Sequence, residues 1–526
     1  MSNQIHIIQN AITTTISEIF RGDFRRICEV KKAVLHLEAI YFCHGTCYLL
    51  KRENMPIKDQ LALYQRIELI PQSTTEFFEN NRECIINNWP EESALAAKPE
   101  ILYDALLASE FCVQPERVGY KIDKVSRDIA GAYYTSSDFS AQITYRALES
   151  YMDRKRRRAI DSDSFACCNE YENITFLDYS CGCGEFLLAV IQYFDNHVLG
   201  YSRKKLATQL RGVDVNPIAL MITIARIVSA VEAEDDENLL REVAKNFIVG
   251  NPLLHSDKIA PLEVRFDNFA LNRLYAETEG INCLELEQQN LVVLGNPPWE
   301  KLRFEERAFF RPVCPAISAI SQKNKREKEI KKLAVNWLEL LEYYQLLQDD
   351  YASVKKEIPK HPLLKVSLVG ELNTYAMFAE LASRLTEKDG FAAIIVKSAL
   401  VTSTCYSSCF RHFVNQGSLS EVFLFDNREK LFQIDSREKF CVLFFGGEHA
   451  GGIKVHYGLT KQEQILSSVP INVTSEELEL INPETGLLPN VADSKEFSFL
   501  LRTHRSLSVF AKEFPKCHFG RLVHLT

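Results

Sequence analysis

From Ile174 onward the chain repeats one unit, a short apolar run that ends in Gly, Asp or Asn and is followed by a helical stretch. Apolar runs that alternate with helices indicate parallel strands covered on both faces. Ligands of such sheets bind at the carboxyl ends of the strands. The pattern predicts an α/β fold with a doubly wound, mostly parallel sheet. The runs are ITFLDYSCGCG, LRGVDVNP, FIVGNPLL, LVVLGNPPW, FAAIIVKSAL, EVFLFDN and FCVLFFGG.

Composition excludes several other protein classes. The 526 residues are 46% hydrophobic and 25% charged, with a formal charge of −9, which is typical of a globular protein rather than a disordered or collagen-like chain. No run of about 18 uncharged apolar residues and no secretory signal pattern occurs, so we expect a cytoplasmic protein without a membrane partner. The acidic balance leaves room for a local basic cleft, and hence for nucleic acid.

The pattern divides the chain into parts. Residues 1–120 show helical periodicity and predict a helical N-terminal domain. Residues 121–452 contain the strand pattern, interrupted near residues 321–359 by a long charged segment that predicts a helical hairpin or arm. Residues 453–526 mix short strands and helices and form a C-terminal segment.

The first candidate site is the segment of residues 178–186 (DYSCGCGEF), which follows a strand and opens a helix. Its two glycines permit a tight turn and a close approach of backbone to ligand, and the helix N-terminus attracts an acceptor. A nucleotide-type loop is one interpretation and a plain tight turn is the other, because the third glycine of a dinucleotide fingerprint is missing.

A second and a third site follow at later strand ends. Asp214 is placed to hold the ribose hydroxyls of an adenosine, and its spacing from the glycine loop favours that role. A helix cap before Pro217 is the alternative. At Asn296-Pro297-Pro298-Trp299, two prolines hold the asparagine and the prolyl carbonyls rigidly. Such acceptors can grip an exocyclic amino group, and Trp299 can stack on a planar base. A structural Pro-Pro turn is the alternative.

These segments, in this order, resemble the S-adenosylmethionine-dependent amino-methyltransferases, in particular the gamma-type N6-adenine DNA methyltransferases, whose catalytic motif is Asn-Pro-Pro and an aromatic. Residues 131–135 (GAYYT) resemble the segment that precedes the glycine loop in that family. Residues 370–378 and 425–432 resemble later segments of the large enzymes of type I and type IIG restriction-modification and of the BREX and DISARM phage-defence systems.

The resemblance implies a Rossmann-like sheet and site-specific transfer of methyl from S-adenosyl-L-methionine to adenine N6 in double-stranded DNA. Tyr179, Cys183 and Asn251 depart from the family pattern, which puts cofactor affinity in doubt more than reaction type. The implied catalytic residues are Asn296, Pro297, Pro298 and Trp299, and the implied cofactor residues are Tyr134, Thr135, Asp178, Cys181, Gly182, Gly184, Phe186, Asp214 and Asn251.

Other features concern partners. Cations at residues 154–158 and 323–332 could neutralise DNA phosphates, or could be solvated helix faces. The fifteen cysteines lack zinc-type spacing, so no metal is expected. In the resembled large enzymes a target-recognition domain follows the region that ends here, so we expect specificity from a separate subunit or a longer product.

Two competing interpretations remain. Release-factor glutamine and ribosomal guanine methyltransferases also use Asn-Pro-Pro with an aromatic, so the acceptor could be protein or RNA. Alternatively, the chain is a non-catalytic scaffold or sensor in a defence complex.

Overall fold

The computed structural model describes residues 2–96, 98–122, 135–161, 171, 173–256, 260–274, 280–281, 290–387, 389–446 and 452–506. Outside the described residues lie residues 131–134 of the GAYYT segment, which include Tyr134, and residues 507–526 at the end of the C-terminal segment. Among the described helices, none combines the length and the apolar character needed to cross a membrane.

The N-terminal region is built around one interior helix, α2, which is buried along most of its length. A helix that is apolar on all sides belongs inside a protein, and α2 packs against α1, α3, α4 and α6 as well as against α12 and α14 of the sheet region. The helices are α1 (Ser2–Ile19), α2 (Ile27–Leu49), α3 (Ile57–Arg66), α4 (Gln72–Asn80), α5 (Arg82–Asn87), α6 (Glu92–Leu95) and α7 (Pro99–Leu107).

The helical pattern expected to residue 120 ends earlier. Strands β1 (Ser109–Gln114) and β2 (Arg117–Ile122) pair antiparallel as a hairpin. Alternation of Phe111 and Val113, and of Val118 and Tyr120, gives the two-residue period of strands, and the hairpin turns at Pro115 and the residue after it. The expectation of a purely helical segment was therefore wrong over this stretch.

All seven apolar runs form strands of one nine-stranded sheet, in the order β13-β12-β10-β11-β9-β8-β3-β4-β5. The neighbouring strands β9, β8, β3, β4 and β5 are all parallel to one another. Strands β10 and β12 are also parallel to each other, whereas β11 and β13 run antiparallel to the strands beside them. This confirms a mostly parallel sheet. Its strands are β3 (Thr175–Asp178), β4 (Leu210–Asp214), β5 (Phe247–Val249), β8 (Leu291–Gly295), β9 (Phe391–Lys397), β10 (Leu419–Asp426), β11 (Lys439–Phe445), β12 (Ile453–Leu459) and β13 (Ile471–Val473).

The centre of the sheet is covered on both faces. Every residue of β8 and all but the last residue of β9 are buried, and successive strand residues point to opposite faces. A separate pair is formed by β6 (Asn251–His255) and β7 (Gly280–Ile281). The helices of this part are α9 (Ser137–Asp161), α10 (Glu185–His197), α11 (Arg203–Gln209), α12 (Pro217–Ala230), α13 (Glu237–Ala244), α14 (Leu262–Ala270), α20 (Thr374–Leu385), α21 (Ala399–Thr402), α22 (Ser407–Asn415), α23 (Gln464–Ser467), α24 (Ser475–Ile481) and α25 (Ser494–Ser506), with short 3-10 turns η3 (Thr404–Tyr406) and η4 (Asn427–Glu429).

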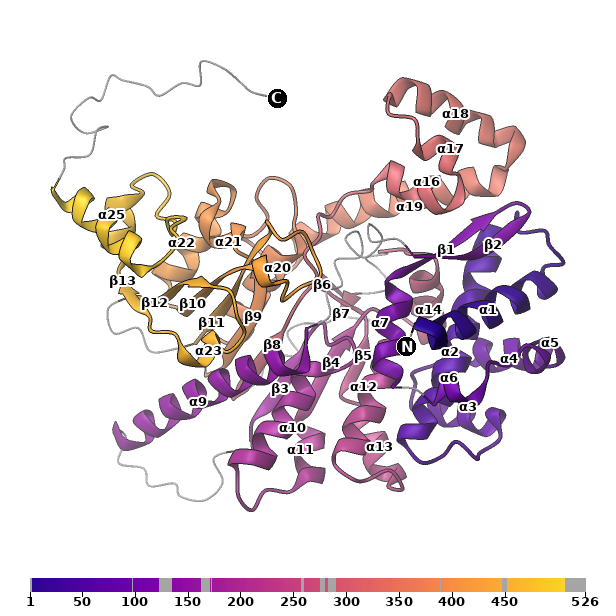
Figure 1. Cartoon of the computed structure of the whole chain (residues 1–526), viewed down its shortest axis with the longest axis horizontal. Helices are drawn as coiled ribbons and strands as arrows, with labels where there is room; N and C mark the ends of the chain where they lie inside the picture. The colour runs from indigo at the N-terminus through magenta and orange to yellow at the C-terminus, as the bar shows by residue number, and fades with distance from the viewer. Residues whose placement is uncertain are drawn as a thin grey trace.

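The charged segment that the sequence places near residues 321–359 lies within a longer helical insertion. This insertion comprises α16 (Glu306–Val313), α17 (Pro315–Ser318), α18 (Lys323–Asn336), α19 (Leu338–Glu357) and the 3-10 turn η2 (Ile358–Lys360). Helices α18 and α19 pack against each other, and Figure 1 shows α17 and α18 standing clear of the body at the upper right. We call residues 306–360 the arm.

Candidate functional site

The carboxyl ends of β3, β4 and β8 meet at one edge of the sheet, which we call the carboxyl edge. β3 lies between β4 and β8, and all three strands are parallel. After β3 the chain adds β4 and β5 on one side of this strand. It later adds β8 and β9 on the opposite side of β3, so the direction in which the sheet grows is reversed at β3. Where strand order reverses in this way, an open α/β sheet has its ligand crevice. The residues that follow these strands therefore form the candidate site.

A tight loop follows β3 and leads into α10. The Cys181 amide donates to the carbonyl of Val213 in β4, at 3.0 Å. Gly182 and Gly184 have φ angles of +49° and +85°, a conformation that side chains disfavour. A Cβ on Gly184 would lie 2.7 Å from Thr223 Cγ2, whereas one on Gly182 would meet nothing within 4 Å. Gly184 thus permits close packing on α12, and Gly182 leaves open space beside the loop.

Two side chains of helix α12 hold this loop by donating hydrogen bonds to the backbone carbonyls of the loop. Thr223 Oγ1 donates to the Gly182 carbonyl at 2.7 Å, and Arg226 donates to the Cys183 carbonyl. Arg226 also forms a buried ion pair with Glu185, at 2.6 Å. Sequence reasoning did not identify Thr223 or Arg226, because no local pattern connects residues inside a helix with a loop on another element.

Asp214 lies at the end of β4 and is oriented by backbone amides. Its Oδ2 accepts from Gly182 N–H and its Oδ1 from Asn216 N–H, each at 2.9 Å. Burial raises the pKa of Asp214, and the amide donors act in the opposite direction. Each oxygen keeps a second lone pair that can accept a ligand hydroxyl. The capping role that was the alternative for Asp214 belongs to Asn216, whose Oδ1 accepts from Ile218 N–H at 3.0 Å.

Asp178, the last residue of β3, is 2% exposed and lies against the end of β8. Its Oδ1 accepts from Ser180 N–H at 3.0 Å, and a Cβ on Gly295 would come within 2.7 Å of that oxygen. Burial raises the pKa of Asp178 to about 8, against the lowering effect of the Ser180 amide, and the charge of Asp214 adds to the rise. The carboxyl is therefore mainly protonated at pH 7, and a cationic ligand would favour its ionised form.

The remaining predicted cofactor residues lie around the same strand ends. The amide of Gly250 donates to the Asp214 carbonyl at 2.9 Å, which places the start of β6 beside β4. Asn251 accepts from Leu253 N–H at 3.0 Å, so its side-chain oxygen also fixes the local turn. Cys181 and Phe186 are 5% and 3% exposed.

The Asn-Pro-Pro segment follows β8 directly and is held on two sides. Asn296 Nδ2 donates to Thr135 Oγ1 at 3.1 Å, which joins two predicted site residues from distant parts of the chain. The Pro298 carbonyl accepts from Thr374 Oγ1 at 2.7 Å, and Thr374 Oγ1 in turn accepts from Glu300 N–H at 2.9 Å. Thr374, at the start of α20, belongs to the segment 370–378 singled out in the sequence, which did not predict this positioning contact.

Trp299 occupies a different place from the one expected. Its residue is 5% exposed, and its Nε1 donates to the Ile395 carbonyl of β9 at 3.3 Å. Its ring stacks on Phe440 and meets the edge of Phe432, with centroids 6.1 and 5.3 Å away. The face expected to stack on a base is thus covered in this structure, because residues from β11 and the turn before it reach the indole.

Asn427 fixes the turn that brings Phe432 to Trp299. Its side-chain amide donates to the Phe432 carbonyl at 2.9 Å and accepts from the Phe432 amide at 3.0 Å. Asn427 is fully buried, and two hydrogen bonds to one residue determine its side-chain orientation. The segment 425–432 therefore holds Phe432 in place against the indole of Trp299.

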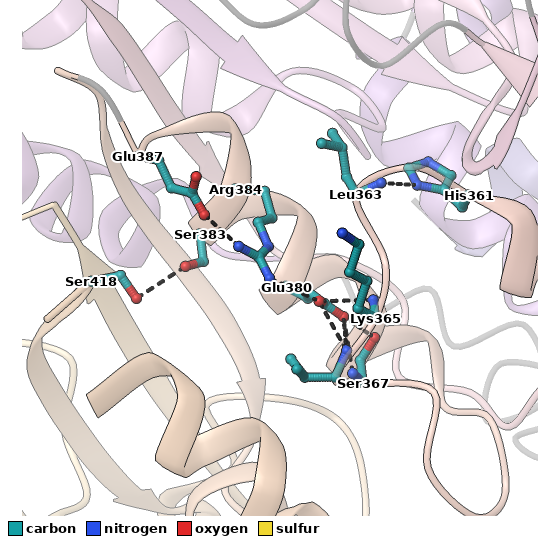
Figure 2. A network of polar contacts seen from close by, with 10 residues as sticks. His361, Leu363, Lys365, Ser367, Glu380, Ser383, Arg384, Glu387 and Ser418 are labelled. Atoms are coloured by element: carbon teal, nitrogen blue, oxygen red, sulfur yellow. Dashed lines mark hydrogen bonds and ion pairs between the residues drawn. The ribbon is translucent and has the colours of Figure 1, made fainter. Parts of the chain in front are cut away.

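A second polar network joins the segment that follows the arm, residues 361–367, to α20 (Figure 2). Glu380, which is fully buried, accepts hydrogen bonds from the backbone amides of Lys365, Val366 and Ser367 and from Ser367 Oγ, at 2.7 to 3.1 Å. His361 approaches the Pro252 carbonyl through Nε2, at 3.2 Å. The segment through which the arm returns is thus fastened to the sheet region.

The first of the two predicted cation runs, residues 154–158, begins with an arginine that lies inside the fold. Arg154 is 7% exposed and donates through Nη2 to the carbonyls of Asp389 and Gly390, at 2.7 and 2.8 Å, and through Nη1 to that of Gly446. Gly390 precedes β9 and Gly446 follows β11, so Arg154 seals the opposite edge, which we call the amino edge. The interpretation of Arg154 as a phosphate ligand is therefore wrong. Its partners are carbonyls from strand termini that the sequence did not connect to it.

Among the residues that the structure describes, no group of three or more His, Cys, Asp or Glu side chains is arranged to hold a metal ion. Cys43 and Cys47 are buried in α2, and the intervening His44 pairs through Nδ1 with Gln60 Oε1 at 2.9 Å. Burial in an apolar helix accounts for this cysteine pair.

Comparison with models of protein families found no match, and no curated protein matched the sequence. Solved structures share low similarity with the chain. A complex of DrdV with DNA has a TM-score of 0.46 and 13% identity, covering 90% of this chain and 46% of that one. A nuclease-deletion mutant of the Type ISP restriction-modification enzyme LlaGI, bound to a DNA substrate mimic, has a TM-score of 0.43 and 14% identity, covering 88% and 35%.

The methyltransferase subunit of a type I restriction-modification system from Streptococcus thermophilus has a TM-score of 0.34 and 10% identity, with 96% of this chain and 93% of that one covered. By contrast, the matched region spans less than half the length of DrdV and of LlaGI. Its neighbours are restriction-modification enzymes and methyltransferases, at TM-scores below those that establish a common fold.

Proposed function

We propose that this chain is an S-adenosyl-L-methionine-dependent methyltransferase with a doubly wound, Rossmann-like sheet, and that it methylates the N6 amino group of adenine in DNA. One observation carries the proposal. At the carboxyl edge, Asn296 contacts Thr135, while Asp178 lies against the strand that delivers Asn296 and Asp214 holds the glycine loop. Segments of the resembled family's motifs thus meet where such a sheet binds its ligand.

The residues fit the cofactor in hydrogen bonding and charge. Open space lies beside Gly182, and the Asp214 carboxylate is oriented next to it to accept ribose hydroxyls. The buried Asp178 carboxyl would be stabilised in its ionised form by a cationic ligand. When bound, S-adenosyl-L-methionine would supply an electrophilic methyl group attached to a positively charged sulfur.

Asn296 and Pro297 would hold the target amino group. Because the oxygen and nitrogen of an amide lie on opposite sides of Cγ, the contact of Asn296 Nδ2 with Thr135 turns Oδ1 the other way, where it can accept from an amino N–H. The two prolines keep this acceptor rigid. Adenine would have to leave its stack to reach it, and the contribution of these residues is then mainly positioning.

The biological role that we propose is host-DNA marking in restriction-modification or phage defence. A separate specificity or defence subunit would supply recognition of the DNA sequence. The covered ring of Trp299 implies that base stacking would need that indole to move, or would fall to another aromatic side chain.

The decisive experiment replaces Asn296 by Ala. We expect methyl transfer to fall about 100-fold or more, because the amino group loses its positioned acceptor, while cofactor binding and Tm stay close to those of the parent. Transfer of radiolabelled methyl to unmethylated genomic DNA, followed by identification of the methylated nucleoside, measures this. Each assay is run with and without a candidate specificity subunit.

Asn296→Asp is the matched control, since it keeps an acceptor oxygen and should retain part of the activity. Unchanged transfer by Asn296→Ala would remove this residue from the catalytic role. Transfer to RNA or protein alone would overturn the DNA acceptor. Cofactor binding without transfer to any acceptor would favour a scaffold or sensor.

A further inference from the structure

The arm begins and ends at the carboxyl edge. The chain leaves the Asn-Pro-Pro-Trp motif, pairs Leu302 with Leu372 through an amide-to-carbonyl bond of 2.8 Å, and enters α16. It returns at Thr374, whose amide donates to the Glu300 carbonyl at 2.9 Å. Any duplex whose adenine reaches Asn296 therefore lies on the side of the molecule from which the arm projects.

The arm is firmly built. Arg326 is buried on the inner side of α18, where it pairs with Glu306 of α16, and Tyr344 Oη donates to the other oxygen of Glu306 at 2.6 Å. Trp337, between α18 and α19, donates through Nε1 to the Arg25 carbonyl at 2.7 Å. The Glu380 network fastens the returning segment (Figure 2). A surface on this arm has a fixed place relative to Asn296.

The outward face of α18 is cationic. The inward positions are Arg326, Ile330 and Leu333, and helical periodicity places Lys325, Lys328, Lys331 and Lys332 on the other side. The acids of the helix lie on its flanks, where Glu327 pairs with Lys323 and Glu329 with Lys332, at 3.8 and 2.7 Å.

Three lysines of this face, Lys325, Lys328 and Lys331, are exposed and have no ion pair within the described part of the chain. Like charges three or four residues apart destabilise a helix, and a polyanion laid along the face relieves that repulsion. A helix of 14 residues is about 21 Å long, or about six base pairs of duplex.

We propose that Lys325, Lys328 and Lys331 form a phosphate-binding face for double-stranded DNA, and that this face holds the duplex whose adenine enters the site at Asn296. This inference rests on the proposed function. The other cation run does not compete for the role, because Arg154 seals the amino edge and α9 lies at the opposite corner of the molecule (Figure 1).

The test is a triple variant, Lys325→Gln with Lys328→Gln and Lys331→Gln, in the full chain. We expect its affinity for a labelled unmethylated DNA duplex to fall roughly tenfold at low salt, and the slope of log K against log salt to fall by about 2 to 3. Fluorescence anisotropy over a salt series measures both. Cofactor affinity and Tm should be those of the parent.

The control carries the same charge change elsewhere, with Lys58→Gln, Lys245→Gln and Lys454→Gln on exposed lysines of α3, the turn after α13 and β12. It should bind DNA almost as the parent does. Equal losses for both triple variants, or no loss for the arm variant while the parent binds and methylates DNA, would overturn the inference alone. A parent chain that methylates RNA or protein but neither binds nor methylates DNA would instead overturn the proposed DNA acceptor.

Discussion

The two edges of the central sheet use polar groups in opposite ways. At the amino edge, the buried guanidinium of Arg154 meets three carbonyls from the ends of β9 and β11. At the carboxyl edge, the carboxyl groups of Asp178 and Asp214 are crowded beside backbone amides, and burial raises the pKa of both. One edge satisfies its hydrogen bonds within the fold. The other keeps acceptors and open space, at the expense of stability, as functional sites commonly do.

The largest effect on stability is expected at the amino edge. Arg154→Met should reduce the free energy of unfolding by about 3 kcal/mol, because the carbonyls of Asp389, Gly390 and Gly446 lose a charged donor and the bond to Gly390 is buried. Urea unfolding measures this. Arg156→Met, on the same helix with a side chain half exposed, should change it by less than about 0.5 kcal/mol. Similar losses in the two variants would contradict the sealing role of Arg154.

A smaller effect, with the opposite sign, is expected at the carboxyl edge. The folded pKa of Asp178 is about 8, well above that of an unfolded carboxyl, so the folded state holds a proton that the unfolded state has lost. The free energy of unfolding should therefore fall as pH rises from about 4 to 8. Asp178→Asn removes this titration, so its stability relative to the parent should rise between pH 5 and pH 8, and it should be the more stable of the two at pH 8.

Urea unfolding at pH 5 and pH 8 tests this expectation, with the exposed Asp235→Asn as control. In the parent, affinity for S-adenosyl-L-methionine should rise with pH toward 8, because the cation favours the carboxylate. The Asn variant should bind it more weakly and without that pH dependence. A variant less stable than the parent at pH 8 would show that Asp178 stabilises the fold.

The smallest effect is expected within the glycine loop, where Gly182 adjoins open space and Gly184 packs against α12. Gly182→Ala should cost about 1 kcal/mol of stability for its positive φ and should weaken cofactor binding more than this, since its Cβ would enter the open space. Gly184→Ala should lose more stability, because its Cβ meets Thr223. Thermal unfolding and calorimetric titration of both variants would show the contrast, and identical behaviour would contradict it.

Much of the sheet was predictable because its signal is local. Each of the apolar runs becomes a strand of the sheet, since burial on both faces requires continuous apolar residues whatever the neighbouring strand is. The charged segment between Ser321 and Pro359 similarly predicts helices that lie on the surface. The glycine loop and the Asn-Pro-Pro motif were recognisable because tight turns restrict residue type.

Only the tertiary structure decided which of these features meet. It joins Thr135 to Asn296 and covers Trp299 with a residue from β11. It also places the two helices that carry the cation runs, α9 and α18, at opposite corners of the molecule (Figure 1). Such contacts depend on strand order and chain crossing, which leave no periodic trace in sequence. The chain alone therefore determined the elements and the chemistry available, and the topology determined which edge of the sheet could use it.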